Sequence, residues 1–255
     1  MIQISNLSYS YDKKEVLTDI SIGIRKGDFC ALMGLNGSGK STLLKVIAGL
    51  LPIRQGEIRI EGKNSANYSP TLLAQQIAYV PQQQDIVFDF SVWDTVMMGR
   101  NPYQGRWETE SARDKEIVNK VLKQCHIEHL KERMLSQLSG GEMQRTLIAR
   151  AMAQEAPIML LDEPLSNLDI IHKYEIMGIL TKLNRNGQTI IIILHDFPVA
   201  IQYVAKTIIL KNGQLENYGN VIEVLSPENI RLAFDLPDNI QIDKSGNVSL
   251  ATHHK

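Results

Sequence analysis

A glycine-rich stretch early in the chain has the residue types and the spacing needed to hold a nucleoside triphosphate. Residues 34–42 read Gly-Leu-Asn-Gly-Ser-Gly-Lys-Ser-Thr and match the pattern Gly-x4-Gly-Lys-[Ser/Thr]. Glycines let consecutive backbone N–H groups curl around phosphate oxygens. Lys40 would reach the β- and γ-phosphates, and the Ser41 hydroxyl would bind Mg²⁺. The predicted loop residues are Gly34, Asn36, Gly37, Ser38, Gly39, Lys40, Ser41 and Thr42.

The segments on either side of this loop fit the same interpretation. The apolar run Phe29–Met33 is typical of a buried strand, and residues 43–51 carry the apolar stripe of a helix. A helix that follows the loop would direct its positive end at the bound anion. The alternative is a glycine-rich turn that matches by chance, which we put at roughly one in a hundred from average residue usage. Strand, loop and helix together favour nucleotide binding.

Two further groups of polar residues follow predicted buried strands. Asp162 and Glu163 come directly after Ile158–Leu161, and His195 ends the β-branched run 189–194. Ligands bind at the carboxyl ends of strands in open α/β sheets, and buried carboxylates are costly without a purpose. Because successive residues point to opposite sides, Asp162 can face Mg²⁺ while Glu163 faces the attacking water. The alternatives are two solvated turn acids and a capping or packing histidine.

A second candidate anion site lies at Ser139-Gly140-Gly141-Glu142, before the helical run 147–153. Ser139 and Glu142 have the spacing of a capping box, which predicts a helix start whatever else the segment does. Two glycines in a first turn destabilise a helix and are unnecessary for a cap. Their bare N–H groups at a helix N-terminus would suit a phosphate.

Length and composition limit the class of protein. The 255 residues suffice for one large α/β domain or for a domain with a sizeable insertion, and 44% hydrophobic with 22% charged residues is ordinary globular material. A net charge of −1 with interspersed signs gives no indication of a nucleic-acid groove. Cys30 and Cys125 lack ligand spacing, which favours a reducing cytosol. The longest apolar run, 190–194, is too short to span a bilayer, so any membrane part must come from another chain.

The remaining pattern predicts the elements that position these residues. Residues 2–32 alternate apolar and polar as half-buried antiparallel strands do, and Tyr11 near one strand end could stack on an adenine or simply lie on the surface. Residues 82–155 change to helices, beginning at the capping sequences near 91 and 111. A hairpin is expected over 207–217 and a helix at Ser226-Pro227, with a polar tail from about Asp235.

Taken together, these residues resemble the ATP-binding subunit of the ABC transporters over almost the whole chain. These elements occur in the family's order: the aromatic residue, the phosphate loop, Gln82, the Ser-Gly-Gly-Glu signature, the Asp-Glu pair, residues 166–169 and finally His195. The resemblance implies ATP contacts by Tyr11, Gly34, Asn36, Gly37, Ser38, Gly39, Lys40, Ser41, Thr42, Gln82, Ser139, Gly140, Gly141, Glu142 and Asp169. It further implies catalytic roles for Lys40, Glu163 and His195, and Mg²⁺ ligation by Ser41, Gln82 and Asp162.

Residues 96–103 resemble a Val-x-x-Gly-Arg-x-Pro-[His/Tyr] stretch found in subunits that import iron-siderophore complexes, haem or cobalamin, and residues 225–229 resemble those subunits too. The alternative for the first stretch is a helix end and a loop. Leu165 and Lys206 depart from many relatives. The resemblance thus implies ATP hydrolysis that powers a metal-chelate importer. Alternatives are an importer of another solute, an exporter, and a soluble ABC-type ATPase.

The fold implied is a P-loop α/β core with an N-terminal antiparallel β layer and an inserted helical subdomain. We expect residues 1–81 and 156–234 to form the core, 82–155 the helical subdomain with the signature, and 235–255 a C-terminal tail. By resemblance, two copies share two ATP sites and bind two integral-membrane permease subunits at the cytoplasmic face of the cell (inner) membrane. A solute-binding protein would act indirectly, and no nucleic acid is implied.

Overall fold

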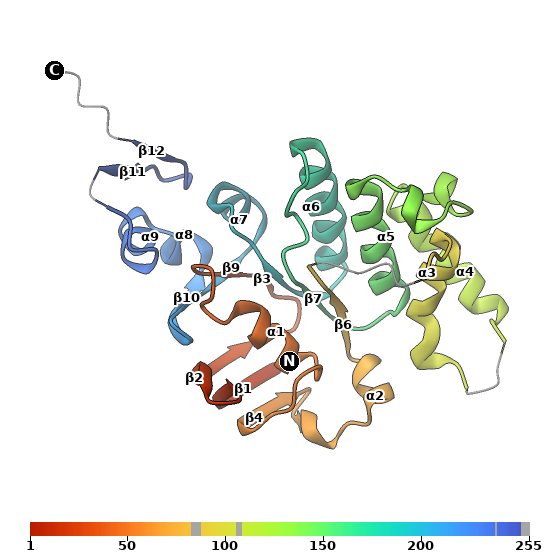
Figure 1. Cartoon of the computed structure of the whole chain (residues 1–255), viewed down its shortest axis with the longest axis horizontal. Coiled ribbons are helices and arrows are strands. Elements are labelled where there is room, and N and C mark those ends of the chain that lie inside the picture. Colours follow the sequence, from red (N-terminus) through yellow and green to blue (C-terminus); the bar gives the residue numbers. More distant parts are fainter. Residues whose placement is uncertain (83–87, 106–108, 238, 251–255) are drawn as a thin grey trace. The chain divides into compact units, whose positions relative to one another are not determined.

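A computed structural model describes residues 1–82, 88–105, 109–237 and 239–250 (Figure 1). The chain divides into two compact units, which are described in turn. The first comprises Met1–Ala66 and Ile191–Lys255, and the second comprises Asn67–Ile190. None of the helices in the described residues has both the length and the apolar character of a membrane-spanning segment.

The first unit begins with the antiparallel layer that the alternating pattern predicts. Its strand order is β2-β1-β4-β5, with β1 at Ile2–Tyr11, β2 at Lys14–Ile24, β4 at Gln55–Ile60 and β5 at Lys63–Asn64. In register, Ile2 faces Ile24 on one side and Ile60 on the other. All three side chains are buried, so the apolar residues of the alternating pattern mark the face of this sheet that packs on the core.

The same unit holds the strand that leads into the phosphate loop. The strand order here is β10-β9-β3-β8, with β3 at Phe29–Met33, β8 at Thr189–Ile193, β9 at Lys206–Lys211 and β10 at Gln214–Asn220. Every residue of β3 is buried, as its apolar run predicts for a strand covered on both faces. The helices of this unit are α1 at Lys40–Ile47, α7 at Phe197–Tyr203, α8 at Val221–Val224 and α9 at Pro227–Ala233.

The segment expected to be a polar tail instead contains a short hairpin. Strands β11 (Ile240–Ile242) and β12 (Val248–Leu250) pair antiparallel. The Asp243 carboxylate closes the turn between them by accepting the backbone N–H groups of Ser245 and Asn247. The hairpin lies against α7, because a Cβ on Gly246 would be 2.8 Å from Phe197 Cβ. The alternation of these few residues was too short to predict a strand pair.

The second unit carries two parallel strands and most of the helices. Strands β6 at Ile77–Val80 and β7 at Ile158–Leu161 pair in parallel. Its α-helices are α2 at Pro70–Ala74, α3 at Val92–Met97, α4 at Ala112–Gln124, α5 at Gly140–Ala153 and α6 at Ile170–Arg185. Short 3₁₀ turns occupy Ser65–Asn67 (η1), Met98–Tyr103 (η2), Glu128–Leu130 (η3) and Leu135–Gln137 (η4). Ser91 and Ser111 cap α3 and α4, which confirms both predicted helix starts.

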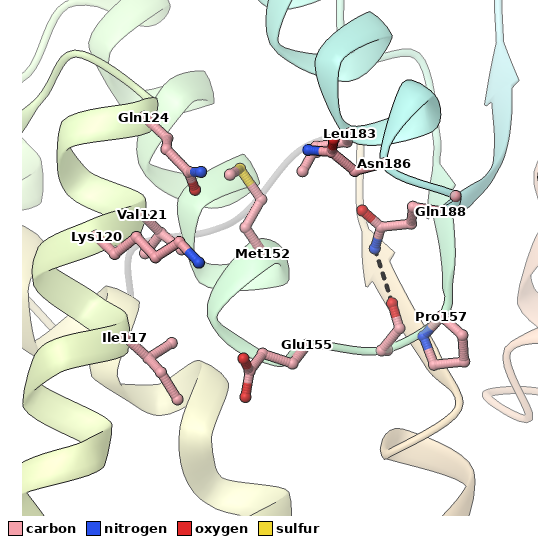
Figure 2. Close-up of a pocket in the computed structure, with 12 residues that line it drawn as sticks. Ile117, Lys120, Val121, Gln124, Met152, Glu155, Pro157, Leu183, Asn186 and Gln188 are labelled. Atoms are coloured by element: carbon pink, nitrogen blue, oxygen red, sulfur yellow. Dashed lines mark hydrogen bonds between the residues drawn. The ribbon is translucent and has the colours of Figure 1, made fainter.

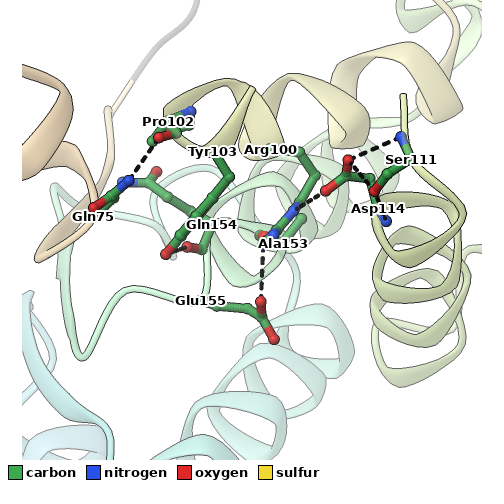
Figure 3. Close-up of polar contacts among 9 residues, drawn as sticks. All are labelled: Gln75, Arg100, Pro102, Tyr103, Ser111, Asp114, Ala153, Gln154 and Glu155. Carbon is green, nitrogen blue, oxygen red and sulfur yellow. Dashed lines mark hydrogen bonds and ion pairs between the residues drawn. The ribbon is translucent and has the colours of Figure 1, made fainter. Parts of the chain in front are cut away.

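Residues 99–103 form a joint around the buried side chain of Arg100 (Figure 3). The Arg100 guanidinium lies 2.8 Å from Asp114 on α4 and 2.9 Å from Glu155 after α5, and it donates to the Ala153 carbonyl oxygen at 2.7 Å. Its carbon also lies 4.3 Å from the centre of the Tyr103 ring. Arg100 therefore ties the residues after α3 to α4 and to the end of α5.

The same joint reaches the start of β6 through glutamines. Tyr103 donates its hydroxyl to the Gln154 carbonyl oxygen at 2.9 Å, and Gln75 donates to the Pro102 carbonyl oxygen at 2.8 Å (Figure 3). The Gln154 amide donates to the carbonyl oxygens of Ala74 and Ile77, which bracket the turn into β6. Because β6 ends two residues before Gln82, this joint fixes the strand that presents that glutamine.

Candidate functional site

The phosphate loop follows β3 and leads directly into α1 in the first unit. Gly34, Gly37 and Gly39 have φ values of +145°, +80° and +98°, which L-residues rarely adopt. At Gly34 a side chain would also run into the Leu210 carbonyl oxygen, and at Gly39 a Cβ would lie 2.7 Å from Leu17. The glycines at these positions are therefore required by backbone conformation, and at Gly34 and Gly39 by close neighbours as well.

The polar groups of this loop suit a phosphate. Lys40 is 5% exposed, and its Nζ donates to the carbonyl oxygens of Gly34 and Leu35, both at 2.9 Å, so that the ammonium lies across the loop. Ser38 Oγ is buried and, among the described residues, has no hydrogen-bond partner. Gly39 caps α1 without a side-chain hydrogen bond, so the cap residue itself supplies no acceptor that would compete with a phosphate at this helix start. These donors fit a bound phosphate chain.

Two other predicted residues lie in the same unit. Tyr11 ends β1 with 43% of its surface exposed, and its ring meets Tyr9 edge-on at 5.0 Å. The exposed face of Tyr11 remains open to stacking. His195 is exposed directly after Leu194, and Asp196 next to it caps α7 by accepting the Val199 N–H at 3.1 Å. The structure thus assigns the capping role to Asp196 rather than to His195.

The acidic pair follows β7 in the second unit, and the two carboxylates differ in their surroundings. Asp162 is 2% exposed and accepts a hydrogen bond of 2.9 Å from the Tyr79 hydroxyl. Glu163 has a φ of +49°, and its Oε2 accepts a hydrogen bond of 2.8 Å from the Gln82 amide. Left-handed backbone at a non-glycine residue is uncommon and concentrates at functional sites. The two carboxylates have different hydrogen-bond partners, as expected if they do different work.

The signature turn starts α5 as a complete capping box. Ser139 Oγ accepts the Glu142 N–H at 3.4 Å, and the Glu142 carboxylate accepts both the N–H and the hydroxyl of Ser139 at 2.8 Å. These hydrogen bonds lower the pKa of Glu142 below its usual range. Ser139 and Gly140 are exposed and Gly141 is buried. Asp169 caps α6 in the same unit by accepting the His172 N–H at 2.9 Å.

Comparison with known proteins agrees with this geometry. A family model described as "ABC transporter" matches residues 17–166. The petrobactin import ATP-binding protein FpuC of Bacillus anthracis is 36% identical over 241 residues, which are 94% of this chain and 89% of that protein. This chain belongs to the ABC transporter family. It is an ABC-type ATPase with the fold expected from its sequence, a P-loop α/β core with an antiparallel β layer and a helical segment.

Solved structures of ABC proteins have the same fold. An inward-facing transporter described as a putative metal-chelate type superposes with a TM-score of 0.83 at 28% identity, covering 99% of this chain and 98% of that one. A dimeric bacterial ABC transporter cassette superposes with a TM-score of 0.77 at 30% identity, covering 87% of this chain and 99% of that one. Both likenesses extend over nearly all of the ABC ATPase, including the parts outside residues 17–166.

Sequence reasoning missed several partners of the predicted residues in this ABC ATPase. Tyr79 on β6 is partly buried, so its hydroxyl needs an acceptor, but the sequence pattern does not say which group supplies it. The parallel pairing of Tyr79 with Leu160 brings that hydroxyl to Asp162, two residues further along. The hydrogen bond from Gln82 to Glu163 joins residues 81 positions apart, and no local pattern predicts it. These partners depend on strand pairing.

A cavity in the second unit lies away from these residues. It has a volume of about 380 Å³ and lies among the ends of α4, α5 and α6, where Lys120, Met152 and Leu183 contribute to its wall (Figure 2). Gln188 closes one side by donating to the Ala156 carbonyl oxygen at 2.7 Å. None of its lining residues is a predicted site residue, so this cavity is separate from the nucleotide chemistry.

Proposed function

We propose that this ABC ATPase binds and hydrolyses ATP to power an importer for a metal chelate. Two observations carry the ATPase part: the first unit has a complete phosphate loop, and the second unit has a glutamate, Glu163, whose carboxylate Gln82 holds. The likeness to a petrobactin import protein and to a metal-chelate type transporter supports the solute class. The Gly99–Tyr103 stretch supports the subfamily only weakly, because Arg100 is buried and contacts its own chain.

Different residues would bind the phosphates, stack on the adenine, activate the water and hold the metal ion. Lys40 and the loop N–H groups would bind the β- and γ-phosphates, and Tyr11 would stack on the adenine. Glu163 and His195 would orient the attacking water and accept its proton, with Gln82 holding the Glu163 carboxylate in place. Mg²⁺, with Ser41, Gln82 and Asp162 as protein ligands, would neutralise phosphate charge.

We further propose that the active unit is a homodimer. Each chain has one phosphate loop and one signature, and an isologous dimer would pair the loop of one protomer with the signature of its partner twice. A dimeric relative of similar fold supports this arrangement. Two integral-membrane permease subunits at the cytoplasmic face of the membrane would complete the transporter, with a solute-binding protein acting on the other side.

Reconstitution with the permease subunits tests this proposal. In proteoliposomes, the wild-type complex should take up a ferric siderophore, haem or cobalamin only with ATP. Glu163→Gln should retain ATP binding and lower hydrolysis and uptake together by roughly a thousandfold, because water activation is lost while the phosphate donors remain. ATP-driven uptake of an unrelated solute alone would contradict the chelate assignment, and normal turnover by the variant would contradict the role of Glu163.

A further inference from the structure

The two glycines of the signature turn have different surroundings. A Cβ built on Gly140 would have only a Leu168 methyl group near it, at 3.9 Å. A Cβ built on Gly141 would lie 2.5 Å from Cδ2 and 2.7 Å from Cγ of the His172 ring. Real Cβ contacts are almost never that short, so the imidazole of His172 occupies the space that a side chain at 141 would need. Gly141 therefore has a packing reason to be glycine that Gly140 lacks.

Two charged groups meet the His172 ring at the same nitrogen. Its Nδ1 lies 3.1 Å from Arg145 Nη1 on α5 and 3.1 Å from Glu175 Oε2 on α6. Arg145 and Glu175 also form an ion pair of 2.5 Å with each other. Arg145 comes one helical turn after Gly141, so both lie on the same face of α5. The ring is thus fixed between the first turns of α5 and α6.

The same histidine belongs to the cap of α6. Its backbone N–H donates to Asp169 Oδ1 at 2.9 Å, and its Nε2 lies 3.8 Å from Asp169 Oδ2. Asp169 and Ser139 are both predicted to contact nucleotide. His172 therefore touches the two segments that carry them, through Gly141 on one side and Asp169 on the other.

We propose that His172 is a positioning residue, which fixes the signature turn at the start of α5 against the start of α6. This inference rests on the proposed function, because the signature turn must contact ATP for its position to matter. A misplacement of about 1 Å costs catalysis up to about a hundredfold. A mobile signature turn should therefore lower kcat, while the binding of ATP to the loop of the same chain stays unchanged.

A set of four variants tests the proposal by ATPase kinetics and by ATP affinity of the single chain. Gly141→Ala should lower kcat about tenfold or more, and His172→Ala should lower it several-fold. The double variant Gly141→Ala with His172→Ala should have a higher kcat than Gly141→Ala alone, since removing the ring makes room for the new methyl group. His172→Asn should stay near wild type, because its planar amide retains atoms at the Cγ, Cδ2 and Nδ1 positions. ATP affinity should not change in any of them.

Two controls keep the outcomes separate. Gly178 lies within α6, and a Cβ at this position would have nothing within 4 Å. The variant Gly178→Ala should therefore have the kcat of the wild type. Ser139→Arg tests the signature itself: if it retains full activity, the proposed function fails. If Ser139→Arg is inactive while His172→Ala matches Gly178→Ala, the positioning role is wrong. A double variant whose kcat is no higher than that of Gly141→Ala would also overturn it. Position 141 would then have to lack a side chain because of the nucleotide and not because of His172.

Discussion

Two helices of this chain begin at glycine-rich turns, and their glycines serve different purposes. In the phosphate loop before α1, the glycines adopt φ values from +80° to +145°. In the signature turn before α5, neither glycine has positive φ, and the atoms nearest to a Cβ on Gly141 belong to the ring of His172. The first turn needs glycine for backbone conformation, and at Gly34 and Gly39 also for space, whereas the second needs it for space at Gly141.

The caps of the two helices differ in the same sense. Gly39 gives α1 no side-chain acceptor of its own at the cap. Ser139 and Glu142 satisfy two donors of α5 within the chain. A bound phosphate therefore competes with no capping side chain at α1, whereas at α5 it meets a completed capping box. We infer that the phosphate loop supplies most of the ATP affinity and that the signature completes the site.

The largest effects should come from substitutions in the phosphate loop. Gly34→Ala combines positive φ with a collision against the Leu210 carbonyl oxygen, and we expect ATP affinity to fall by about a hundredfold or more. Gly37→Ala is the matched variant, because its φ is also positive but a Cβ meets nothing within 4 Å. It should lose only about tenfold, which corresponds to the 1–2 kcal/mol cost of left-handed backbone.

Equilibrium titration of ATP against each purified variant, with circular dichroism to confirm folding, measures this difference. Equal losses in Gly34→Ala and Gly37→Ala would mean that the close approach to Leu210 is unimportant. Backbone conformation alone would then explain why the phosphate loop needs glycine at position 34.

The contrast between the two turns also explains what the sequence could predict. The phosphate loop and the capping box of Ser139 and Glu142 are local patterns, because each requires only a few consecutive residues, and the structure confirms both. The partners of Asp162, Glu163 and Gly141 come from distant segments, and strand pairing or helix packing decides them. A pattern of residue types carries no information about such neighbours.

The same limit applies to Arg100. Its sequence context resembles a subfamily motif, but nothing in the sequence shows that its guanidinium is buried between Asp114 and Glu155. The boundaries expected for the helical subdomain and the roles of the individual nucleotide contacts remain predictions.

A substitution in the Arg100 joint, at the far end of α5, should have a smaller effect. The joint holds that helix without touching its signature turn, so only the stability of the fold should change. Hydrogen bonds from Ser111 and Arg100 lower the pKa of Asp114 to about 2. The folded state thus favours ionised Asp114, and its stabilisation is present above the unfolded pKa of about 3.9 and is lost as the pH falls toward 2. Asp114→Asn should cost about 2 kcal/mol at pH 7 and much less near pH 2.5, with ATP affinity unchanged.

Urea unfolding at the two pH values measures this effect. Asp94→Asn is the matched control. The Asp94 carboxylate accepts the Ser91 hydroxyl in the cap of α3 but forms no ion pair with another described residue. It should lose less stability than Asp114→Asn at pH 7. Equal losses would mean that Asp114 acts only as a cap and that Arg100 contributes nothing through it.

The central claim is that the phosphate loop of one chain and the signature turn of its partner complete each other's site. A mixed dimer tests it most directly, with Lys40→Ala in one chain, Ser139→Arg in the other, and Glu163→Gln in both to prevent turnover. If sites are shared, both defects fall in one site and the other site keeps an intact Lys40 and an intact Ser139. The account predicts about one tightly held ATP per mixed dimer, because that site retains both sets of backbone donors. Mixed dimers that form but hold almost no ATP would contradict it, since loop and signature would then act within one chain.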